Sequence, residues 1–249
     1  MVRKLAGDVS LNTGIYMKNA LITGASRGLG LALARQLARN GWGLIIDGRV
    51  KEAVEKASAE LSELTNLVAI PGDITTEAHR DQLAQAAAHL GGLDALINNA
   101  STLGLSPQPS LLDYPPAVLE NVYLTNVITP LALIQTLYPN LRPGACILNI
   151  TSDAGVEAYA GWGGYGSSKA ALEHLSHILA EENPGLRVYW ADPGDMRTQM
   201  LQDAFPGEDI SDRPLPEESV PGLLALLEGR KPSGRYRAHE VSESTDEPS

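Results

Sequence analysis

Short apolar runs alternate along the chain with longer stretches in which apolar residues recur every three or four positions. The runs predict strands at 20–23, 44–47, 67–70, 93–98, 145–151 and 186–191, with a last edge strand at 234–238. The periodic stretches predict helices at 29–40, 50–64, 76–90, 118–138, 163–182 and 216–228. Strands that alternate with helices are typical of βαβ units, whose parallel sheet is covered on both faces. We therefore predict an α/β fold: a Rossmann-type doubly wound parallel sheet of about seven strands flanked by helices.

Three segments fall outside this alternation. Residues 1–16 precede the first strand and predict an N-terminal extension, so that a single Rossmann-type catalytic domain spans residues 17–238. Residues 193–216 show no periodicity, and a long irregular stretch in a compact domain is typical of a substrate lid or binding loop. Residues 239–249 contain acids and no Lys or Arg, which predicts an acidic disordered tail.

Composition narrows the class of partner. Thirty acids against nineteen Lys and Arg give a net charge of −11, which argues against a nucleic acid or an anionic membrane. No apolar run approaches the ~18–20 residues of a membrane span, so we expect a cytoplasmic protein without a membrane partner. The only cysteine, Cys146, allows no disulfide within the chain and is expected in the core. His174 and His177 share a helix without a third ligand, so no metal is expected.

A glycine-rich turn follows the first predicted strand and opens the first predicted helix. Residues 23–30 read TGASRGLG, and glycines there let the backbone approach a pyrophosphate that the helix N-terminus stabilises. The spacing G-x-x-x-G-x-G resembles that of the short-chain dehydrogenase/reductase family, in its compact single-domain branch. The resemblance extends from Lys18 to Ala238.

The residues after the second strand bear on the choice of nicotinamide cofactor. The acid that grips a ribose 2′-hydroxyl in the family pattern is replaced by Gly48, and Arg49 follows. Asp47 lies one place earlier, where strand alternation points it elsewhere. Arg27 and Arg49 can together bind a 2′-phosphate, which favours NADP(H), although Arg49 could instead cap a loop.

The resemblance implies further cofactor contacts. Ser101 stands where the family's N-N-A-G motif has glycine, which leaves the local backbone and the pocket volume open. The implied cofactor-binding residues are Gly24, Ser26, Arg27, Gly28, Leu29, Gly30, Arg49, Asp73, Ile74, Asn99, Tyr165, Lys169, Pro193, Gly194 and Thr198.

Tyr165 and Lys169 lie four residues apart in a predicted helix, so they share a face. An ammonium roughly 4–5 Å away lowers a phenol pKa by about two to three units, towards the working pH. Ser152 ends the fifth strand, where its hydroxyl can polarise a substrate carbonyl. The resemblance implies that Ser152 and Tyr165 bind the substrate oxygen and that Lys169 binds the nicotinamide ribose. It also places Asn126 where a distorted helix backbone holds a relay water.

Each feature alone has a simpler interpretation, because Tyr/Lys pairs are commonly solvated contacts and strand-end serines are commonly caps. Their order downstream of the glycine-rich turn favours catalysis. We therefore predict an NADP(H)-dependent oxidoreductase that interconverts a carbonyl and a secondary alcohol on a small-molecule substrate. The alternatives are a non-catalytic NADP(H)-binding sensor or scaffold, or an epimerase or dehydratase of the same family.

Several features around the predicted site stay open. Tyr159, Trp162, Met196 and Phe205 either wall the substrate pocket or pack in the core. Six acids between residues 203 and 218 make either a solvated face or a site for a cationic substrate. The resemblance further implies a homodimer or homotetramer, formed through the long helices.

Overall fold

The computed structural model describes residues 17–229 and 231–243, and these form one parallel sheet with helices on both faces. The sheet has the order β3-β2-β1-β4-β5-β6-β7. Its strands are β1 (Asn19–Ile22), β2 (Gly43–Gly48), β3 (Leu67–Pro71), β4 (Leu93–Asn98), β5 (Leu141–Ile150), β6 (Arg187–Asp192) and β7 (Gly234–Arg237). The chain winds outward from β1 to β3 and then returns to place β4 beside β1. This reversal confirms the predicted doubly wound sheet and opens a crevice at the carboxyl ends of the strands.

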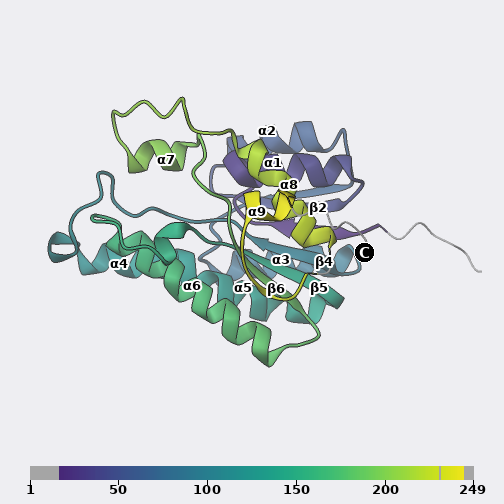
Figure 1. The fold of residues 1–249 in the computed structure, drawn as a ribbon. Helices are drawn as coiled ribbons and strands as arrows, with labels where there is room; N and C mark the ends of the chain where they lie inside the picture. The colour runs from purple at the N-terminus through teal and green to yellow at the C-terminus, as the bar shows by residue number, and fades with distance from the viewer. Residues whose placement is uncertain (1–16, 230, 244–249) are drawn as a thin grey trace, which may run out of the picture.

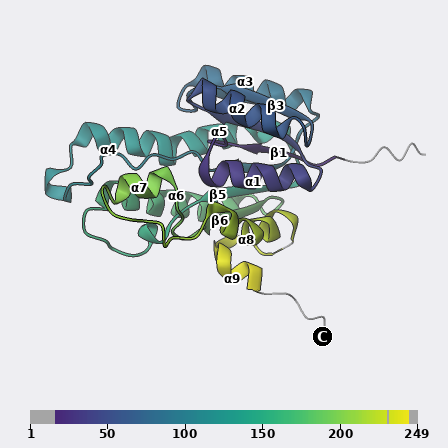
Figure 2. The ribbon, with the colours of Figure 1, turned by 90° about the horizontal axis from the view of Figure 1, so that it is seen from above.

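Helices cover both faces of the sheet (Figures 1 and 2). Alternating strand residues bury their side chains in two separate cores. Ile22 and Ile46 face one core and Leu21 and Ile45 face the other, all with no exposed surface. The first core is covered by α1 (Gly28–Arg39), α2 (Lys51–Leu61) and α8 (Pro216–Glu228). The second is covered by α3 (Glu77–His89), α5 (Thr129–Leu137) and α6 (Gly163–Glu182). Strands buried on both faces explain the continuous apolar runs of the sequence.

The helix predicted at 118–138 is divided into three segments. It comprises α4 (Pro116–Tyr123), a π-helical turn η2 (Leu124–Ile128) and α5. Pro130 explains the interruption, because it has no N–H with which to donate to the carbonyl of Asn126 four residues earlier. The wider turn lies where the family resemblance placed a distorted helix backbone.

By length and composition, the helical segment Pro116–Asn140 is apolar enough to cross a membrane, which the sequence analysis did not anticipate. In this fold, part of the segment packs on the sheet, where Leu133, Ile134 and Leu137 are buried in the second core. Its apolar composition therefore has a structural reason on one side of α5.

Two irregular regions contain structure that periodicity did not predict. The segment 193–216 contains α7 (Gln199–Ala204), whose six residues are too few to show a helical repeat. The predicted disordered tail is wrong for residues 239–243, which belong to α9 (Ala238–Glu243). Val241 of α9 is 5% exposed, and its packing on the first core explains this order. Residues 1–16 and 244–249, which complete the predicted extension and tail, lie outside the described residues.

Three single-turn 3-10 segments complete the described chain: η1 (Leu111–Asp113), η3 (Tyr138–Asn140) and η4 (Asp153–Gly155). The last follows β5 directly and starts from Ser152, which caps it.

Candidate active site

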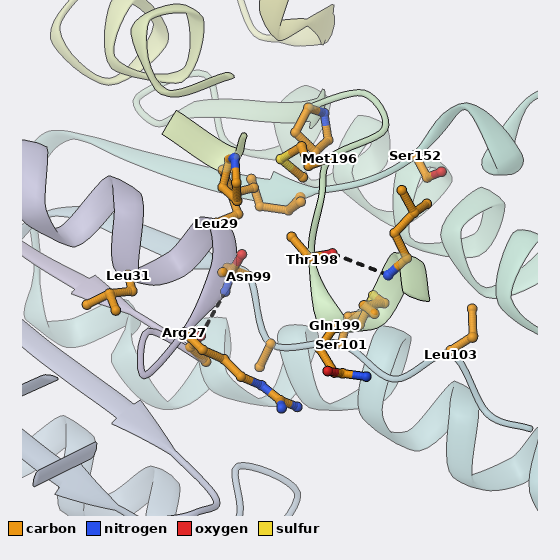
Figure 3. Close-up of a pocket in the computed structure, with 18 of the residues that line it drawn as sticks. Arg27, Leu29, Leu31, Asn99, Ser101, Leu103, Ser152, Met196, Thr198 and Gln199 are labelled. Carbon is orange, nitrogen blue, oxygen red and sulfur yellow. Dashed lines mark hydrogen bonds between the residues drawn. The ribbon is translucent and has the colours of Figure 1, made fainter. Parts of the chain in front are cut away.

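A cavity of about 1000 Å³ opens at the carboxyl ends of the strands and extends under α7. It is lined by all but two of the residues that the sequence predicts for the site, the exceptions being Gly30 and Asn126. Figure 3 shows Arg27 towards one side of this pocket and Ser152 and Leu103 towards the other. The fold therefore gathers residues from the whole length of the domain around one cleft.

The glycine-rich turn has the geometry of a phosphate cradle. Gly24 has a φ of +65°, which side-chain-bearing residues rarely adopt, and its N–H donates to the Asp47 carboxylate at 2.6 Å. Gly30 supports the turn from behind, because a Cβ there would lie 2.5 Å from Nδ2 of Asn99. No side chain among the described residues caps the N-terminus of α1, so its first N–H groups are available to an anion.

The end of β2 leaves no carboxylate free for a ribose. Gly48 has no room for a side chain, since a Cβ there would lie 2.8 Å from Oγ of Ser26. Asp47 is 1% exposed and uses its carboxylate on Gly24 and on His79, whose Nε2 lies 3.1 Å from Oδ2. Arg27 and Arg49 are exposed and line the pocket. These residues fit a cofactor that carries a 2′-phosphate.

The turn after β3, which contains the predicted cofactor-binding residues Asp73 and Ile74, also lines the pocket. Asp73 accepts hydrogen bonds from the N–H and the hydroxyl of Thr75 at 2.9 and 2.8 Å. Burial alone would raise the pKa of Asp73, but these bonds prevail and lower it, so the carboxylate stays ionised. Ile74 is 6% exposed and offers an apolar surface beside it.

Asn99, a predicted cofactor-binding residue, braces the glycine-rich turn in this structure. Its Nδ2 donates to the carbonyls of Thr23 and Gly24 at 2.8 and 3.2 Å. Its backbone N–H donates to the Thr23 hydroxyl at 3.0 Å. Asn99 therefore ties the end of β4 to the glycine-rich turn while it lines the pocket.

Asn126 lies in the π-helical turn η2, 1% exposed, and its side chain is fully engaged. Nδ2 donates to the carbonyl of Thr102 at 2.9 Å and to the Ser168 hydroxyl at 3.0 Å. Oδ1 accepts from the Thr102 N–H and from the Ser101 hydroxyl, at 2.9 and 3.1 Å. The Asn126 side chain thus joins the loop after β4 to α6. Ser101 contributes a hydroxyl donor to this contact that a glycine at position 101 would lack.

Ser152 lies where β5 ends, as the sequence predicts, and starts the η4 turn. Its Oγ accepts from the Ala154 N–H at 3.2 Å and donates to Oδ1 of Asp153 at 2.9 Å. The other carboxylate oxygen of Asp153 accepts from the Tyr159 hydroxyl at 2.9 Å. The serine hydroxyl is therefore at the pocket surface with a carboxylate beside it.

Tyr165 and Lys169 lie together in α6, with the Lys169 ammonium 5.4 Å from the centre of the Tyr165 ring. The predicted lowering of the phenol pKa is wrong for this structure: burial, followed by Asp192 and Asp153, raises the pKa of Tyr165, and a hydrogen bond with Ser152 opposes the rise. Lys169 itself is 2% exposed, and burial lowers its pKa to about 8. Its Nζ donates to the carbonyl of Ile150 at 2.8 Å, so the ammonium serves the backbone as well as the phenol.

A polar network behind Ser152 escaped the sequence analysis. Glu173 lies one turn beyond Lys169 and accepts from the Thr151 hydroxyl at 2.7 Å and from Nε of Arg235 at 3.1 Å. Arg235, on the edge strand β7, also donates to the backbone carbonyl of Ser152 at 3.4 Å. The spacing of Tyr165, Lys169 and Glu173 could have pointed to Glu173, but the partner strand lies 62 residues farther along the chain.

The segment 193–216, predicted to be a lid or binding loop, is anchored at its start. The Ser219 hydroxyl donates to the carbonyl of Pro193 at 2.7 Å, and the Gly194 N–H donates to Oδ1 of Asp192 at 2.9 Å. Thr198 starts α7, because its hydroxyl oxygen accepts from the Leu201 N–H at 3.3 Å. Thr198 and Met196 line the central part of the pocket (Figure 3).

Part of the pocket is walled by apolar and aromatic side chains. Tyr159, Trp162, Met196 and Phe205, for which the sequence left pocket and core open, all line it. Sequence reasoning missed further apolar lining residues because they lie in irregular segments or in the short helix α7: Leu103, Met200, Leu201 and Ala204. His174 and His177 are exposed on α6, and Cys146 is fully buried in the core, as expected.

Comparison with known proteins gives consistent matches. The family model described as short chain dehydrogenase matches residues 18–209. A rhamnolipids biosynthesis 3-oxoacyl-[acyl-carrier-protein] reductase of Pseudomonas aeruginosa is 38% identical over 197 residues, 74% of each chain. Sepiapterin reductase of Meriones unguiculatus is 34% identical over 205 residues, covering 76% of this chain and 78% of the relative.

Solved structures agree. A short chain dehydrogenase from Shigella flexneri, complexed with NADP, is 31% identical with a TM-score of 0.82, covering 89% of this chain and 97% of that one. A short chain dehydrogenase from Escherichia coli, complexed with NADPH, is 31% identical with a TM-score of 0.81, covering 89% and 96%. Sequence, sheet order and pocket thus agree that the chain belongs to the short-chain dehydrogenase family.

Proposed function

We propose that this protein is an NADP(H)-dependent oxidoreductase that interconverts a carbonyl and a secondary alcohol. The observation that carries the proposal is the meeting of Ser152, Tyr165 and Lys169 in a pocket whose other end presents Arg27 and Arg49. One end has the groups for proton transfer to a substrate oxygen, and the other has cations for a 2′-phosphate. The relatives are oxidoreductases, and two similar structures hold NADP or NADPH.

The residues of the glycine-rich turn, with Arg27 and Arg49, would hold the cofactor, and Lys169 would bind its nicotinamide ribose. When bound, NADPH supplies the hydride. Ser152 turns its hydroxyl from Asp153 to the substrate oxygen and orients the carbonyl. Because its pKa is raised, Tyr165 is protonated at neutral pH and can donate its proton to the developing alkoxide. The Lys169 ammonium then stabilises the phenolate that remains.

The role of Asn126 is proposed to reside in its backbone rather than in its side chain. Its side-chain amide is fully engaged with Thr102, Ser101 and Ser168. The backbone carbonyl lacks the regular donor that Pro130 would have supplied. This carbonyl is therefore suited to hold a relay water between Lys169 and solvent.

The domain organisation and cellular context belong to the same proposal. Residues 17–238 form the catalytic domain, 1–16 an extension and 193–216 a substrate lid that carries α7. We place the enzyme in the cytoplasm, with a small molecule as its partner. The net charge of −11 favours solubility and disfavours a nucleic acid or an anionic membrane as partner. Leu124, Ile128 and Ile178 are 37%, 55% and 41% exposed on the long helices, which supports assembly into a homodimer or homotetramer.

Exchange of Tyr165 for phenylalanine tests the reaction. Loss of the proton donor should reduce NADPH-dependent turnover by about 10²–10⁴-fold over a panel of ketones and aldehydes. The dissociation constant for NADPH, measured by calorimetry, should change little because the ring remains. Tyr138→Phe is the matched control, since Tyr138 is 53% exposed and not among the lining residues of the pocket.

Turnover by Tyr165→Phe at the rate of the unaltered enzyme would contradict the proposed role. An unaltered protein that binds NADPH but reduces no carbonyl in the panel would indicate a sensor or scaffold.

A further inference from the structure

We infer that the substrate of this pocket is a planar aromatic carbonyl compound without an anionic group, and that Trp162 and Phe205 determine this specificity. The inference rests on the proposed function, since it concerns the molecule whose carbonyl meets Tyr165.

Three aromatic rings form a continuous wall that ends on the proposed proton donor. The rings of Trp162 and Tyr165 meet edge to face, with centroids 5.9 Å apart and planes at 70°. Phe205, the only phenylalanine in the chain, lies 5.9 Å from Trp162 at 51°. Because the substrate oxygen must lie within hydrogen-bond distance of the Tyr165 phenol, the groups on its carbonyl carbon are brought beside this wall. Aromatic faces and edges of this kind favour another ring over an alkyl chain.

Further apolar side chains pack around the Tyr165 ring. Leu103 and Ala154 form a buried cluster with Tyr165, and Met200 and Ala204 pack against it. These side chains come from the loop after β4, from η4 and from α7, so they flank the phenol from several sides. Methionine adapts its shape to a flat ring and makes favourable contacts with aromatic edges.

The aromatic wall joins two elements that lie far apart in the sequence. Trp162 directly precedes α6 and Phe205 directly follows α7, and the contact between their rings links the two segments. A second link fixes α7, because the Ser106 hydroxyl donates to the carbonyl of Asp203 at 2.6 Å. The lid and the start of the catalytic segment therefore meet at the aromatic wall, and a flat ring can lie against it.

Charge sets a second condition on the substrate. Asp153, Asp192 and Asp195 line the pocket, and all three contribute, after burial, to the raised pKa of Tyr165. Asp195 has Arg213 4.0 Å away and Asp192 has Arg235 3.8 Å away, so both carboxylates already have a cation near them. The ammonium of Lys169 lies beside the phenol, where it already donates to the carbonyl of Ile150. Arg27 and Arg49 line the cofactor end of the pocket. A substrate carboxylate near the phenol would meet several like charges in a partly desolvated site, which disfavours binding.

A set of matched ketones tests the inference. Acetophenone, 2-octanone and 4-acetylbenzoate separate the effect of the ring from that of the charge, since the first two have equal carbon number. We expect kcat/KM with NADPH to be at least about tenfold higher for acetophenone than for either of the others. Phe205→Leu and Trp162→Leu should each reduce the ratio of acetophenone to 2-octanone by about 3- to 10-fold.

Controls separate specificity from folding. Phe205→Tyr keeps a ring and should preserve the aromatic preference, and Tyr138→Leu removes an exposed ring that is not among the pocket-lining residues. Melting temperatures identify any variant that is merely unfolded. If a leucine variant is unfolded, the substrate ratios of Phe205→Tyr and of the unaltered enzyme decide whether the pocket prefers an aromatic ketone.

The inference is overturned if kcat/KM for 2-octanone or for 4-acetylbenzoate equals or exceeds that for acetophenone. It is also overturned if folded leucine variants keep the ratio of the unaltered enzyme, or if other carbonyls are reduced and acetophenone is not. In those cases the proposed oxidoreductase function stands, whereas failure to reduce any carbonyl at all overturns that function instead.

Discussion

Burial of Lys169 should leave a measurable pH dependence in the stability of the protein. The side chain is 2% exposed, and burial lowers its pKa from 10.5 to about 8, with Glu173 opposing the change. Each factor of ten in proton affinity corresponds to about 1.4 kcal/mol, so the charged lysine costs the folded state about 3 kcal/mol below pH 8. As the pH rises from 8 towards 10.5, the folded state has released the proton that the unfolded chain still binds. The folding free energy therefore becomes more favourable over this interval.

Urea unfolding between pH 7 and pH 10 measures this effect in the cofactor-free protein. The difference in unfolding free energy between the unaltered protein and Lys169→Met should change by about 2–3 kcal/mol over the range, in favour of the lysine at high pH. Lys51→Met is the control, because the Lys51 side chain is 68% exposed and should show no such change. Parallel curves for the unaltered protein and Lys169→Met would refute the reasoning about burial.

Two further predictions concern other parts of the site. Arg49→Ala should weaken NADPH binding by about tenfold or more and leave NADH nearly unchanged, because Arg49 would contact only the 2′-phosphate; Arg39→Ala, which alters an exposed arginine that does not line the pocket, is the calorimetric control, and equal weakening of both cofactors would contradict the assignment. Glu173→Gln should lower the unfolding free energy by about 2–3 kcal/mol, because it leaves Arg235 without its carboxylate partner. The double variant Glu173→Gln/Arg235→Gln should lose less unfolding free energy than the two single variants lose together. Additive losses in this double-mutant cycle would show that the two side chains do not interact.

The sheet and its cofactor-side residues could be predicted from sequence because their causes are local. An apolar run such as 44–47 has to be a buried strand, and a glycine-rich turn after β1 has to face the crevice of a doubly wound sheet. The positions of Ser152, Tyr165 and Lys169 could also be predicted, because a strand end and a four-residue helical spacing fix them. The boundaries of most elements consequently differ from prediction by only one to three residues.

What sequence reasoning missed depends on contacts between distant segments. Arg235 reaches Glu173 and Ser152 from the edge strand, and α7 is held in place by Thr198 and Ser106 rather than by an apolar repeat. The predicted direction of the Tyr165 pKa shift was wrong for the same reason. Helical spacing accounts for the neighbouring ammonium but not for burial, which acts on both groups and whose extent depends on the tertiary structure.

The π-helical turn at Leu124–Ile128 determines which helix faces the residues before it and after it present to the rest of the fold. If the same residues wound as an uninterrupted α-helix, with none removed, everything beyond the turn would rotate by roughly 100° about the axis. Leu133 and Leu137 would leave the sheet, or Asn126 would leave Ser168 and the loop after β4. An inserted residue that looks like an irregularity is thus what allows one helix to serve the core at one end and the pocket at the other.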